Sequence, residues 1–365
     1  MDHATPIIRN LRARGVVVPM KRPLATGGGT VAKVPLALVD IEIDHGIVGS
    51  AYVFCYTPLA LGPVVQLIGN IGEAMRGAHL APATVFDGQQ ARFRLLGLQG
   101  LAMMAASAID MAAWDALAKA RGVSLCRLLG AAPMPLPAYN SKGLGLIGTE
   151  RAPAEARDLV GEGFTAIKLR LGYRNAAADV AVARAVRDAV GDGIRIMTDY
   201  NQCLDPAEAE IRIRALSEAG LGLDWVEEPV RFDDYAGCAR LRAKASLPIQ
   251  IGENCWGVND MQKALEAGAS DLFMPDAGKI GGVTGWMRAA GLAEPRGLPL
   301  SSHLYPEYSV HLLAATPTRH WLEYVDWAEP VLKSPLPVID GHATAPDIPG
   351  AGIEWNEAAV ARYGA

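Results

Sequence analysis

Seven short apolar segments between Thr165 and Asp326 each end in an ionisable residue, at nearly constant intervals. The endings are Lys168 with Arg170, then Asp199, Glu227, Glu253, Asp276, His303 and Glu323. One strand, one helix and two short loops need about this spacing, so the pattern predicts a βα unit repeated around a closed parallel barrel. All strand C-termini of such a barrel open on one face, where the active site lies. Because burying charge is costly, we interpret this ionisable rim as catalytic.

Three of these endings are carboxylates on successive predicted strands, Asp199, Glu227 and Glu253. Neighbouring carboxylates repel one another unless a hard cation lies among them. Oxygen-only ligands with room for water favour Mg²⁺ over zinc. Three separately solvated loop acids are the alternative, but acids at one register of three consecutive units favour a metal site. Glu228 follows Glu227 directly and should point to the other side of the strand, which makes it the weaker candidate ligand.

Asp276 and His303 end the next two predicted strands. A carboxylate beside an imidazole orients the ring and raises its basicity, so we expect His303 to be a general base supported by Asp276. A lone histidine at a strand end is more often structural, whereas a nearby metal and an acid one strand away favour catalysis. Lys279 follows Asp276 closely and either pairs with it or caps the loop; the sequence favours neither.

Lys168 and Arg170 lie two residues apart on one predicted strand, so both should point into the barrel. Two inward cations beside a bound metal indicate an anionic substrate. Desolvation and a neighbouring cation should lower the pKa of Lys168, whereas an arginine keeps its proton. Glu323 lies in the apolar segment HWLEYVDW. There we expect a protonated carboxyl that donates a hydrogen bond to the substrate carboxylate, with an ordinary surface glutamate as the alternative.

The chain has 365 residues, which suits a barrel with one further domain. Its net charge is −5 at pH 7 and it has no Lys/Arg run, so we do not expect it to bind nucleic acid. Five cysteines without CxxC spacing indicate reduced thiols in a cytoplasmic protein. No apolar run approaches about 18 residues and the first ten residues lack an apolar core, so we expect neither a membrane span nor a signal peptide.

The sequence divides into three predicted regions. Residues 1–130 begin with antiparallel strands and continue with helices, among them an apolar helix in which Asp110 should be a satisfied buried carboxylate. The Pro/Gly-rich segment Lys21–Thr30 resembles a phosphate loop but lacks GK[ST]. We interpret residues 20–30 as a mobile flap that decides specificity. Residues 131–335 form the barrel, and residues 336–365 form a Pro/Gly-rich tail that should pack back on the first domain.

The strings AIKLRLGY, TDYNQ, WVEEPV, GEN, MPDAGKIGGVTGW, SSHL and HLLAATPTRHWLE, taken in order, resemble the enolase superfamily and specifically its mandelate racemase subgroup. AYVFCYTP and GLAMMAASAIDMAAWDAL in the first region and DIPGAGIEW in the tail extend the resemblance over nearly the whole chain. The fold that this implies is α/β: a modified TIM barrel, (β/α)7β, with an N-terminal α+β capping domain completed by the C-terminal tail.

The resemblance also implies roles for individual residues. Asp199, Glu227 and Glu253 match the Mg²⁺ ligands, Asp276 and His303 the base dyad, and Glu323 the electrophilic acid. Ser141, Asn201 and Lys168 match polar residues around the metal and the substrate carboxylate. The implied reaction removes the proton α to the carboxylate of a small molecule and gives an enediolate. The family also implies a homo-oligomer, an octamer.

One residue departs from the mandelate racemase pattern, which has Lys-x-Lys where this chain has Lys168-Leu169-Arg170. A racemase needs acid/base groups on both faces of the α-carbon, and an arginine is a poor proton acceptor. The departure favours dehydration of an acid sugar, in which His303 takes the α-proton and then helps a β-hydroxyl to leave.

Other residues keep racemisation of a 2-hydroxy acid open as the alternative. Phe54 and Tyr56 match the aromatic lining of a mandelate pocket. Lys142, Lys21 and Arg22 instead offer cations for a distal carboxylate or polyol, as an acid sugar would need. A barrel that only binds an anion is a third hypothesis, which the intact metal triad and dyad disfavour.

Overall fold

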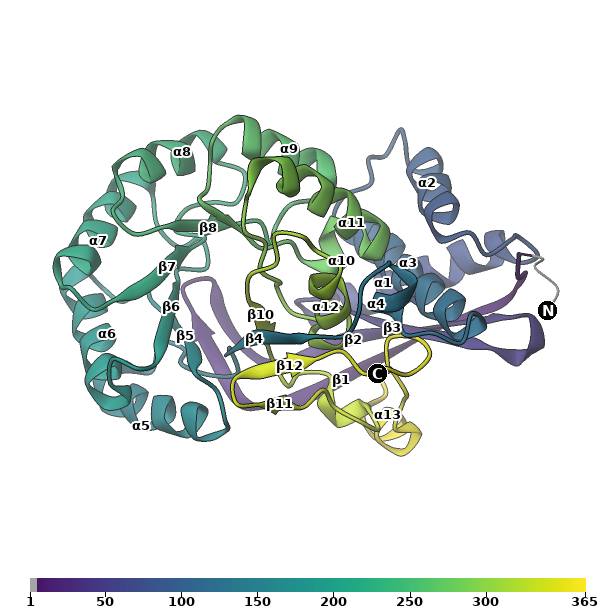
Figure 1. Cartoon of the computed structure of the whole chain (residues 1–365), viewed down its shortest axis with the longest axis horizontal. Coiled ribbons are helices and arrows are strands. Elements are labelled where there is room, and N and C mark those ends of the chain that lie inside the picture. Colours follow the sequence, from purple (N-terminus) through teal and green to yellow (C-terminus); the bar gives the residue numbers. More distant parts are fainter. Residues whose placement is uncertain (1–4) are drawn as a thin grey trace.

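A closed parallel barrel forms the centre of the molecule in the computed structural model, which describes residues 5–365 (Figure 1). Residues 1–4 of the predicted first region therefore lie outside the described chain. The barrel strands are β4 (Pro135–Asn140), β5 (Ala166–Arg170), β6 (Arg195–Asp199), β7 (Leu223–Glu227), β8 (Ile249–Ile251), β9 (Leu272–Phe273) and β10 (Leu322–Tyr324). Single parallel bridges of Leu300 to Phe273 and Arg319 bring an eighth segment between β9 and β10, and β10 pairs with β4 to close the ring.

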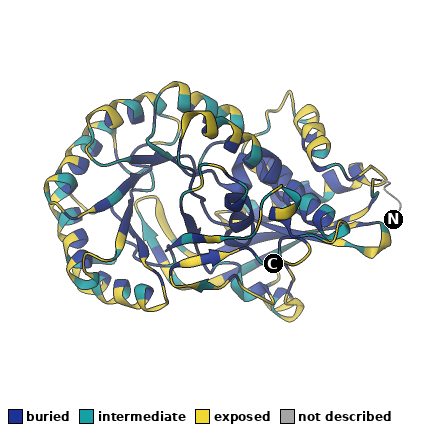
Figure 2. Ribbon diagram, in the orientation of Figure 1, coloured by how far each residue is buried: buried dark blue, intermediate teal, exposed yellow. Residues whose placement is uncertain are grey.

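Helices follow every barrel strand except the last, so the expected (β/α)7β fold class is confirmed. They are α5 (Gly148–Gly161), α6 (Ala176–Val190), α7 (Pro206–Glu218), α8 (Tyr235–Lys244), α9 (Val258–Glu266), α10 (Ala277–Ile280), α11 (Gly282–Ala293) and α12 (Pro306–Ala314), with a 3-10 turn at Glu294–Arg296. The outer helices bury one face only, as Figure 2 shows. In α5, for example, the buried residues Ala152, Ala156 and Leu159 recur at helical spacing.

The capping domain packs a three-stranded antiparallel sheet against helices. Its elements are β1 (Ile8–Thr26), β2 (Gly29–Ile43), a 3-10 turn (Asp44–Gly46), β3 (Val48–Phe54), α1 (Pro58–Met75), α2 (Pro82–Arg92), α3 (Gly100–Ala120) and α4 (Leu125–Leu128). Helix α3 approaches β3 so closely that a Cβ on Gly49 would lie 2.2 Å from the main-chain oxygen of Ala112. Asp110 on α3 is fully buried and accepts hydrogen bonds from the nitrogen and hydroxyl of Thr284, as expected.

Helix α3 is also the one helix among residues 5–365 that is long and apolar enough to cross a membrane. Burial explains its apolar composition, because 83% of its most apolar 18-residue window lies inside the protein. It is the central helix of the capping domain.

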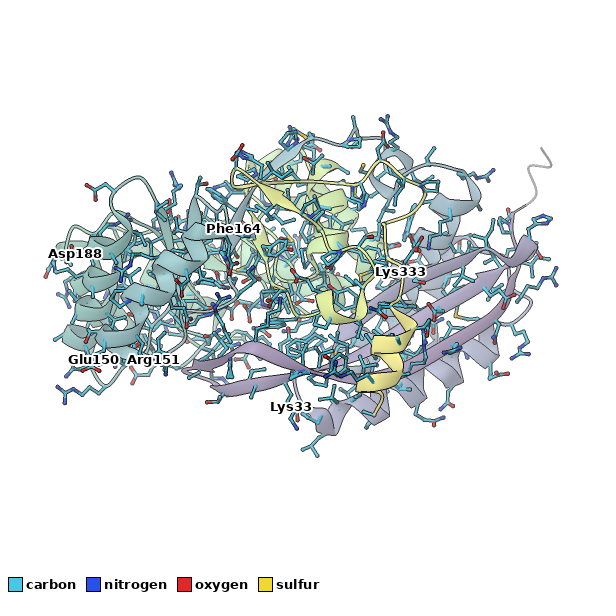
Figure 3. The ribbon with its side chains drawn as sticks, turned by 90° about the horizontal axis from the view of Figure 1, so that it is seen from below. Lys33, Glu150, Arg151, Phe164, Asp188 and Lys333 are labelled. Carbon is cyan, nitrogen blue, oxygen red and sulfur yellow. The ribbon has the colours of Figure 1, made fainter. Side chains whose placement is uncertain are left out.

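The C-terminal tail joins both parts of the molecule. Strands β11 (Val338–Ile339) and β12 (His342–Thr344) form a hairpin whose second strand pairs with β4 of the barrel. Further on, the nitrogen of Ala351 donates to Asp115 of α3 at 2.6 Å. Helix α13 (Glu357–Tyr363) lies against the capping-domain sheet (Figure 3), where Glu357 pairs with Arg14 at 2.5 Å. The first half of the tail thus packs on the barrel, and only its second half packs on the first domain as predicted.

The predicted flap is a β-hairpin rather than an irregular loop. Strand β1 continues to Thr26 and pairs with β2 down to Thr26 opposite Gly29, so only Gly27 and Gly28 remain as the turn. The register shifts between Pro19 and Leu24, where prolines lack the N–H that a ladder needs. The hairpin reaches across the barrel toward β5 and β6 (Figure 1), and the nitrogen of Leu146 donates to Ala25 at 2.7 Å.

Candidate active site

A cavity of about 370 Å³ opens between the strand ends of the barrel and the capping domain. Three groups of residues line it. The barrel contributes Lys168, Arg170, Asp199, Asn201, Glu253, His303, Leu304, Glu323 and Trp327; the hairpin contributes Leu24, Thr26, Gly28, Gly29, Thr30 and Val31; the segment after β3 contributes Phe54 and Tyr56. Residues more than 250 positions apart thus meet in one chamber, as the barrel topology requires.

Lys168 lies at the floor of the cavity with its ammonium among three carboxylates. Its Nζ is 2.6 Å from Glu227, 2.7 Å from Glu323 and 3.3 Å from Asp199. Burial lowers the pKa of Lys168, but the three carboxylates outweigh burial and raise it above its usual range. The expectation of a lowered pKa for Lys168 is therefore wrong for this structure.

The predicted metal ligands are unevenly placed around that ammonium. Asp199 accepts from the nitrogen and the side-chain amide of Asn201 at 2.8 and 2.9 Å, and Glu227 accepts from Lys168 and the indole of Trp225. Glu253 stands apart, toward His303. Within residues 5–365, no three His, Cys, Asp or Glu side chains converge as the ligands of one ion. Lys168 instead supplies the positive charge between Asp199 and Glu227.

The charge balance of this region nevertheless fits a divalent cation. Burial, together with Asp199, Glu323 and Glu253, raises the pKa of Glu227 well above its usual range despite the lowering effect of Lys168. A raised carboxyl pKa means that the negative charge is under-compensated. All three candidate donors are carboxylate oxygens, which are the ligands that Mg²⁺ prefers. Neither Glu227 nor Glu228 lines the cavity, but their contacts differ: Glu227 accepts from Lys168, whereas Glu228, the weaker candidate, accepts from the nitrogen of Gly252.

An isolated parallel bridge, beyond the end of β9, brings Asp276 and His303 together. The Nδ1 of His303 lies 2.6 Å from Asp276 Oδ2, and its Nε2 faces Glu253 at 3.2 Å. Burial lowers the pKa of His303, but the combined effect of Glu253, Glu323 and Asp276 is larger. The pKa of His303 is therefore raised, to about 9. The imidazole therefore has the orientation of a base held by a carboxylate, and its own charge depends on the neighbouring acids.

Glu323 differs from the neutral acid that we expected. Its Oε1 accepts from Ser141 at 2.7 Å and its Oε2 accepts from the nitrogen of Leu304 at 2.9 Å, in addition to the contact with Lys168. Burial raises the pKa of Glu323, but Lys168 and His303 overcome this effect and lower the pKa to about 2. Glu323 is therefore an ionised acceptor in this structure, because every neighbour at hydrogen-bond distance is a donor.

Arg170 is held by main-chain and side-chain oxygens of the loop after β4. Its guanidinium donates to the main-chain oxygens of Ser141 and Gly143 at 3.1 and 2.7 Å, and to the hydroxyl of Ser141 at 2.6 Å. The residue is 4% exposed, and its Nε has no hydrogen-bond partner within residues 5–365. Arg170 thus faces the cavity as a fixed cation. Ser141 connects it to Glu323.

The wall opposite the ionisable residues is aromatic and apolar. The ring of Phe54 packs against Tyr56 at 4.5 Å and edge-on against Trp327 at 5.0 Å between centroids. The sequence reasoning missed Trp327, Leu304 and Val31, whereas Leu24 and the other hairpin residues of the lining fall within the predicted flap 20–30. Trp327 was detectable, because it lies four residues beyond Glu323 in the same strand-end segment.

The cations that were expected to bind a distal substrate group lie elsewhere. Arg22 pairs with Glu162 at 3.0 Å, and Lys142 pairs with the same carboxylate while lying 5.6 Å from the ring of Phe164, which is labelled in Figure 3. Lys21 pairs with Asp326 and Glu329 at 3.3 Å. None of the three lines the cavity in this structure.

Lys279 likewise makes neither of its expected contacts. Its Nζ donates to Asn254 at 2.7 Å and lies 4.1 Å from the ring centroid of Tyr56, whose hydroxyl donates to Asp276 at 3.4 Å. Tyr56, Asn201 and Leu304 also share a left-handed backbone conformation, with φ of 59°, 47° and 53°. Non-glycine residues in this region store strain, which is typical of functional sites.

The fold and this cavity together define an enzyme of the enolase superfamily class, a lyase or isomerase. Two family models support this class. Residues 9–130 match "Mandelate racemase / muconate lactonizing enzyme, N-terminal domain", and residues 151–359 match "Enolase C-terminal domain-like". The chain belongs to the mandelate racemase/muconate lactonizing enzyme family of that superfamily.

Solved structures of relatives share both the fold and the ion. An enolase from alpha proteobacterium BAL199 with bound magnesium is 44% identical, with a TM-score of 0.96 over 99% of this chain and 100% of the other. An enolase from Bradyrhizobium complexed with magnesium and mandelic acid is also 44% identical, with a TM-score of 0.95 over 100% and 99%. The expected cofactor, Mg²⁺, is thereby confirmed.

A curated relative is an acid-sugar enzyme. L-talarate/galactarate dehydratase from Salmonella typhimurium is 35% identical over 266 residues, which are 72% of this chain and 66% of that enzyme. The comparisons therefore establish magnesium-dependent enolase-superfamily chemistry. The relatives include both dehydratases and epimerases, so the comparisons do not decide between the two reactions.

Proposed function

We propose that this enzyme removes the α-proton from one face of a 2-hydroxy acid and then expels a β-hydroxyl, which makes it a dehydratase. The observation that carries the proposal is the confinement of Arg170 by Ser141 and Gly143. An arginine that already donates three hydrogen bonds is a fixed cation and offers no lone pair to a proton. His303 is then the single base, with Asp276 as its partner.

The proposed roles follow from the contacts of each residue. Asp199, Glu227 and Glu253 would hold Mg²⁺, which would supply positive charge next to the substrate carboxylate. Lys168 gives a second positive charge to the substrate carboxylate, and Asn201 presents a buried Oδ1 that has no partner among the described residues. Metal binding needs Lys168 to loosen its contacts with Asp199 and Glu227, because both carboxylates now share its ammonium.

In this reaction His303 both accepts the α-proton and returns it to the leaving group. His303 takes the α-proton as the C–H bond breaks, and the electron pair moves into the carboxylate. The protonated imidazole then gives that proton to the β-hydroxyl, which leaves as water while the C=C bond forms. The product enol tautomerises to a 2-oxo acid. No second base is needed on the opposite face.

The substrate proposed for this cavity has a short uncharged tail. Leu24, Val31, Phe54, Leu304 and Trp327 form its distal wall, whereas the nearby cations are turned away and paired. A 2,3-dihydroxy acid with an apolar substituent satisfies this wall better than a second carboxylate does, because an unpaired buried charge is costly.

The second candidate is racemisation of a 2-hydroxy acid, which the mandelic-acid complex of the Bradyrhizobium relative favours. One experiment separates the candidates. Purified enzyme with Mg²⁺ in D₂O is given mandelate and a set of 2,3-dihydroxy acids, and exchange, optical rotation and 2-oxo acid are recorded. We expect deuterium in one configuration only and water loss from a dihydroxy acid. Inversion of mandelate would support the racemase instead, and absence of all exchange would support a barrel that only binds anions.

A further inference from the structure

Lys279 is a buried lysine that makes no ion pair within residues 5–365. It is 3% exposed and lies on α10, three residues after Asp276. A buried ammonium without a carboxylate partner is costly, so its remaining contacts must hold it there. These contacts are the hydrogen bond to Asn254 Oδ1 at 2.7 Å and the faces of Tyr56 and Trp256, whose ring centroids lie 4.1 and 5.7 Å from Nζ.

Asn254 transmits the position of Lys279 to two carboxylates. Its Nδ2 donates to Glu253 Oε1 at 3.0 Å and to Glu228 Oε2 at 3.3 Å. Lys279 occupies the amide oxygen, so the side chain of Asn254 has one favourable orientation. A flip would place the amide oxygen against two carboxylate oxygens and the NH₂ group against the ammonium. Lys279 thereby determines that Glu253 receives a donor on Oε1, while its Oε2 faces His303.

Tyr56 is the second residue that depends on the same ammonium. Its backbone is left-handed, with φ of 59°, and 39% of the residue is exposed. Besides the ammonium, its hydroxyl contacts Asp276 and its ring contacts Phe54. The ammonium over its ring is attracted to the negative face of the aromatic system, more strongly because it is desolvated. That contact keeps the ring beside Phe54, on the wall of the cavity.

We infer that Lys279 is a positioning residue that orients Glu253 through Asn254 and fixes Tyr56 as part of the substrate wall. The inference rests on the proposed function, because it takes Glu253 to be a metal ligand. It predicts that one side chain outside the cavity supports both the metal and the substrate. Residues that orient a ligand from behind typically change metal affinity 10- to 100-fold when removed.

The test measures Mg²⁺ affinity by isothermal titration calorimetry of the full chain without substrate. Lys279→Met and Asn254→Ala should each raise the Mg²⁺ dissociation constant about tenfold, and the double variant should bind no more weakly than Asn254→Ala alone. A purely electrostatic lysine would act in the opposite direction, since removing a cation near carboxylates tightens Mg²⁺. Wild-type or tighter binding by Lys279→Met, or additive losses in the double variant, would overturn the inference.

Matched controls separate this inference from the proposed function. Lys263→Met removes a 62%-exposed lysine side chain on α9 and should leave the Mg²⁺ dissociation constant unchanged. Glu253→Gln must weaken Mg²⁺ binding for the proposed ligand set to hold, whatever Lys279→Met does. If Lys279→Met does not fold, as judged by circular dichroism, Asn254→Ala decides alone, and unchanged Mg²⁺ affinity in it overturns the inference. Lys279→Met should also raise KM more than it lowers kcat, because Tyr56 lines the wall of the cavity that we propose to bind the substrate.

Discussion

Arg170 donates to both oxygens of Ser141, the main-chain oxygen at 3.1 Å and the hydroxyl at 2.6 Å, and that hydroxyl donates onward to Glu323 at 2.7 Å. Glu323 in turn contacts Lys168. The residue that replaces a second lysine base is thus built into a chain of hydrogen bonds that ends at the substrate-facing ammonium. Moving Arg170 toward a substrate would break that chain of hydrogen bonds. Arg170 therefore acts as a cation in its present position.

The metal site can be tested by removing one carboxylate at a time. Asp199→Asn, Glu227→Gln and Glu253→Gln should each weaken Mg²⁺ binding by about 100-fold or more and abolish α-proton exchange, because the charge of the enediolate is then left uncompensated. Calorimetry with Mg²⁺ and the deuterium-exchange assay give both readouts, and circular dichroism checks the fold. Undiminished turnover of wild-type enzyme after complete chelation would show that the assignment is wrong.

The dyad predicts unequal effects of its two members. His303→Asn should stop exchange entirely for the configuration whose α-proton faces the ring. Asp276→Asn should slow it by roughly 10³–10⁴, because the imidazole loses its orienting carboxylate and its correct tautomer. Both variants should still bind Mg²⁺. Exchange at the wild-type rate in either of them contradicts the dyad.

Magnesium binding should release protons from the enzyme. Without metal, Glu253, Glu323 and Asp276 raise the pKa of His303 to about 9 against the lowering effect of burial, so the ring is protonated at pH 8. An ion at Glu253 removes part of that stabilisation, lowers the pKa of His303 and expels a fraction of a proton. Calorimetry at pH 8 in phosphate and in Tris should give different apparent enthalpies.

The number of protons released on Mg²⁺ binding should also depend on pH in a defined way. Proton release should fall to zero well above pH 9, where the ring of His303 is already neutral, and at low pH, where it stays protonated with metal bound. His303→Asn should remove the buffer dependence. Equal enthalpies in both buffers for the wild type at pH 8 would refute the assigned coupling.

The β1–β2 hairpin can pack this closely against the barrel only because residue 27 is a glycine. A Cβ on Gly27 would lie 2.5 Å from both the Cβ and the Sγ of Cys203, a separation that real structures do not show. Gly27→Ala should therefore lift the hairpin from the barrel and raise KM about tenfold, with Mg²⁺ affinity unchanged. Gly28→Ala is the control, because its Cβ would meet nothing closer than 3.6 Å. Equal KM values in the two variants would place specificity outside the hairpin.

The rim residues were predictable from the sequence because the βα repeat fixes both their spacing and the face on which they lie. Once a strand ends at Asp199 or His303, the parallel topology leaves its side chain few alternatives. His303 lies on the same rim even though the eighth barrel segment has only isolated bridges around Leu300 instead of a regular strand.

The orientation of long side chains was not predictable in the same way. Arg22 and Lys142 both turn to Glu162, at the end of α5, and no local pattern in the sequence indicates that contact. The predicted charge states of two site residues were wrong for a related reason. Lys168 and Glu323 were expected to shift toward neutrality through burial, but their mutual contact stabilises both charges, and such pairing is a property of the assembled barrel.

Arg170→Lys is the variant that decides between the two candidate reactions. A lysine at this position can lose its proton where an arginine cannot, since desolvation and the neighbouring Lys168 both favour the neutral amine. The variant should therefore gain a base on the face opposite His303 and racemise a 2-hydroxy acid that has no β-leaving group, at least about 100-fold faster than the wild type. Polarimetry of mandelate with Mg²⁺ measures this gain. Arg170→Met is the matched control, because it removes the cation without adding a base and should racemise nothing. Rapid loss of optical activity from mandelate with the unmodified enzyme would instead show that Arg170, despite its bonds to Ser141 and Gly143, serves the second face of a racemase.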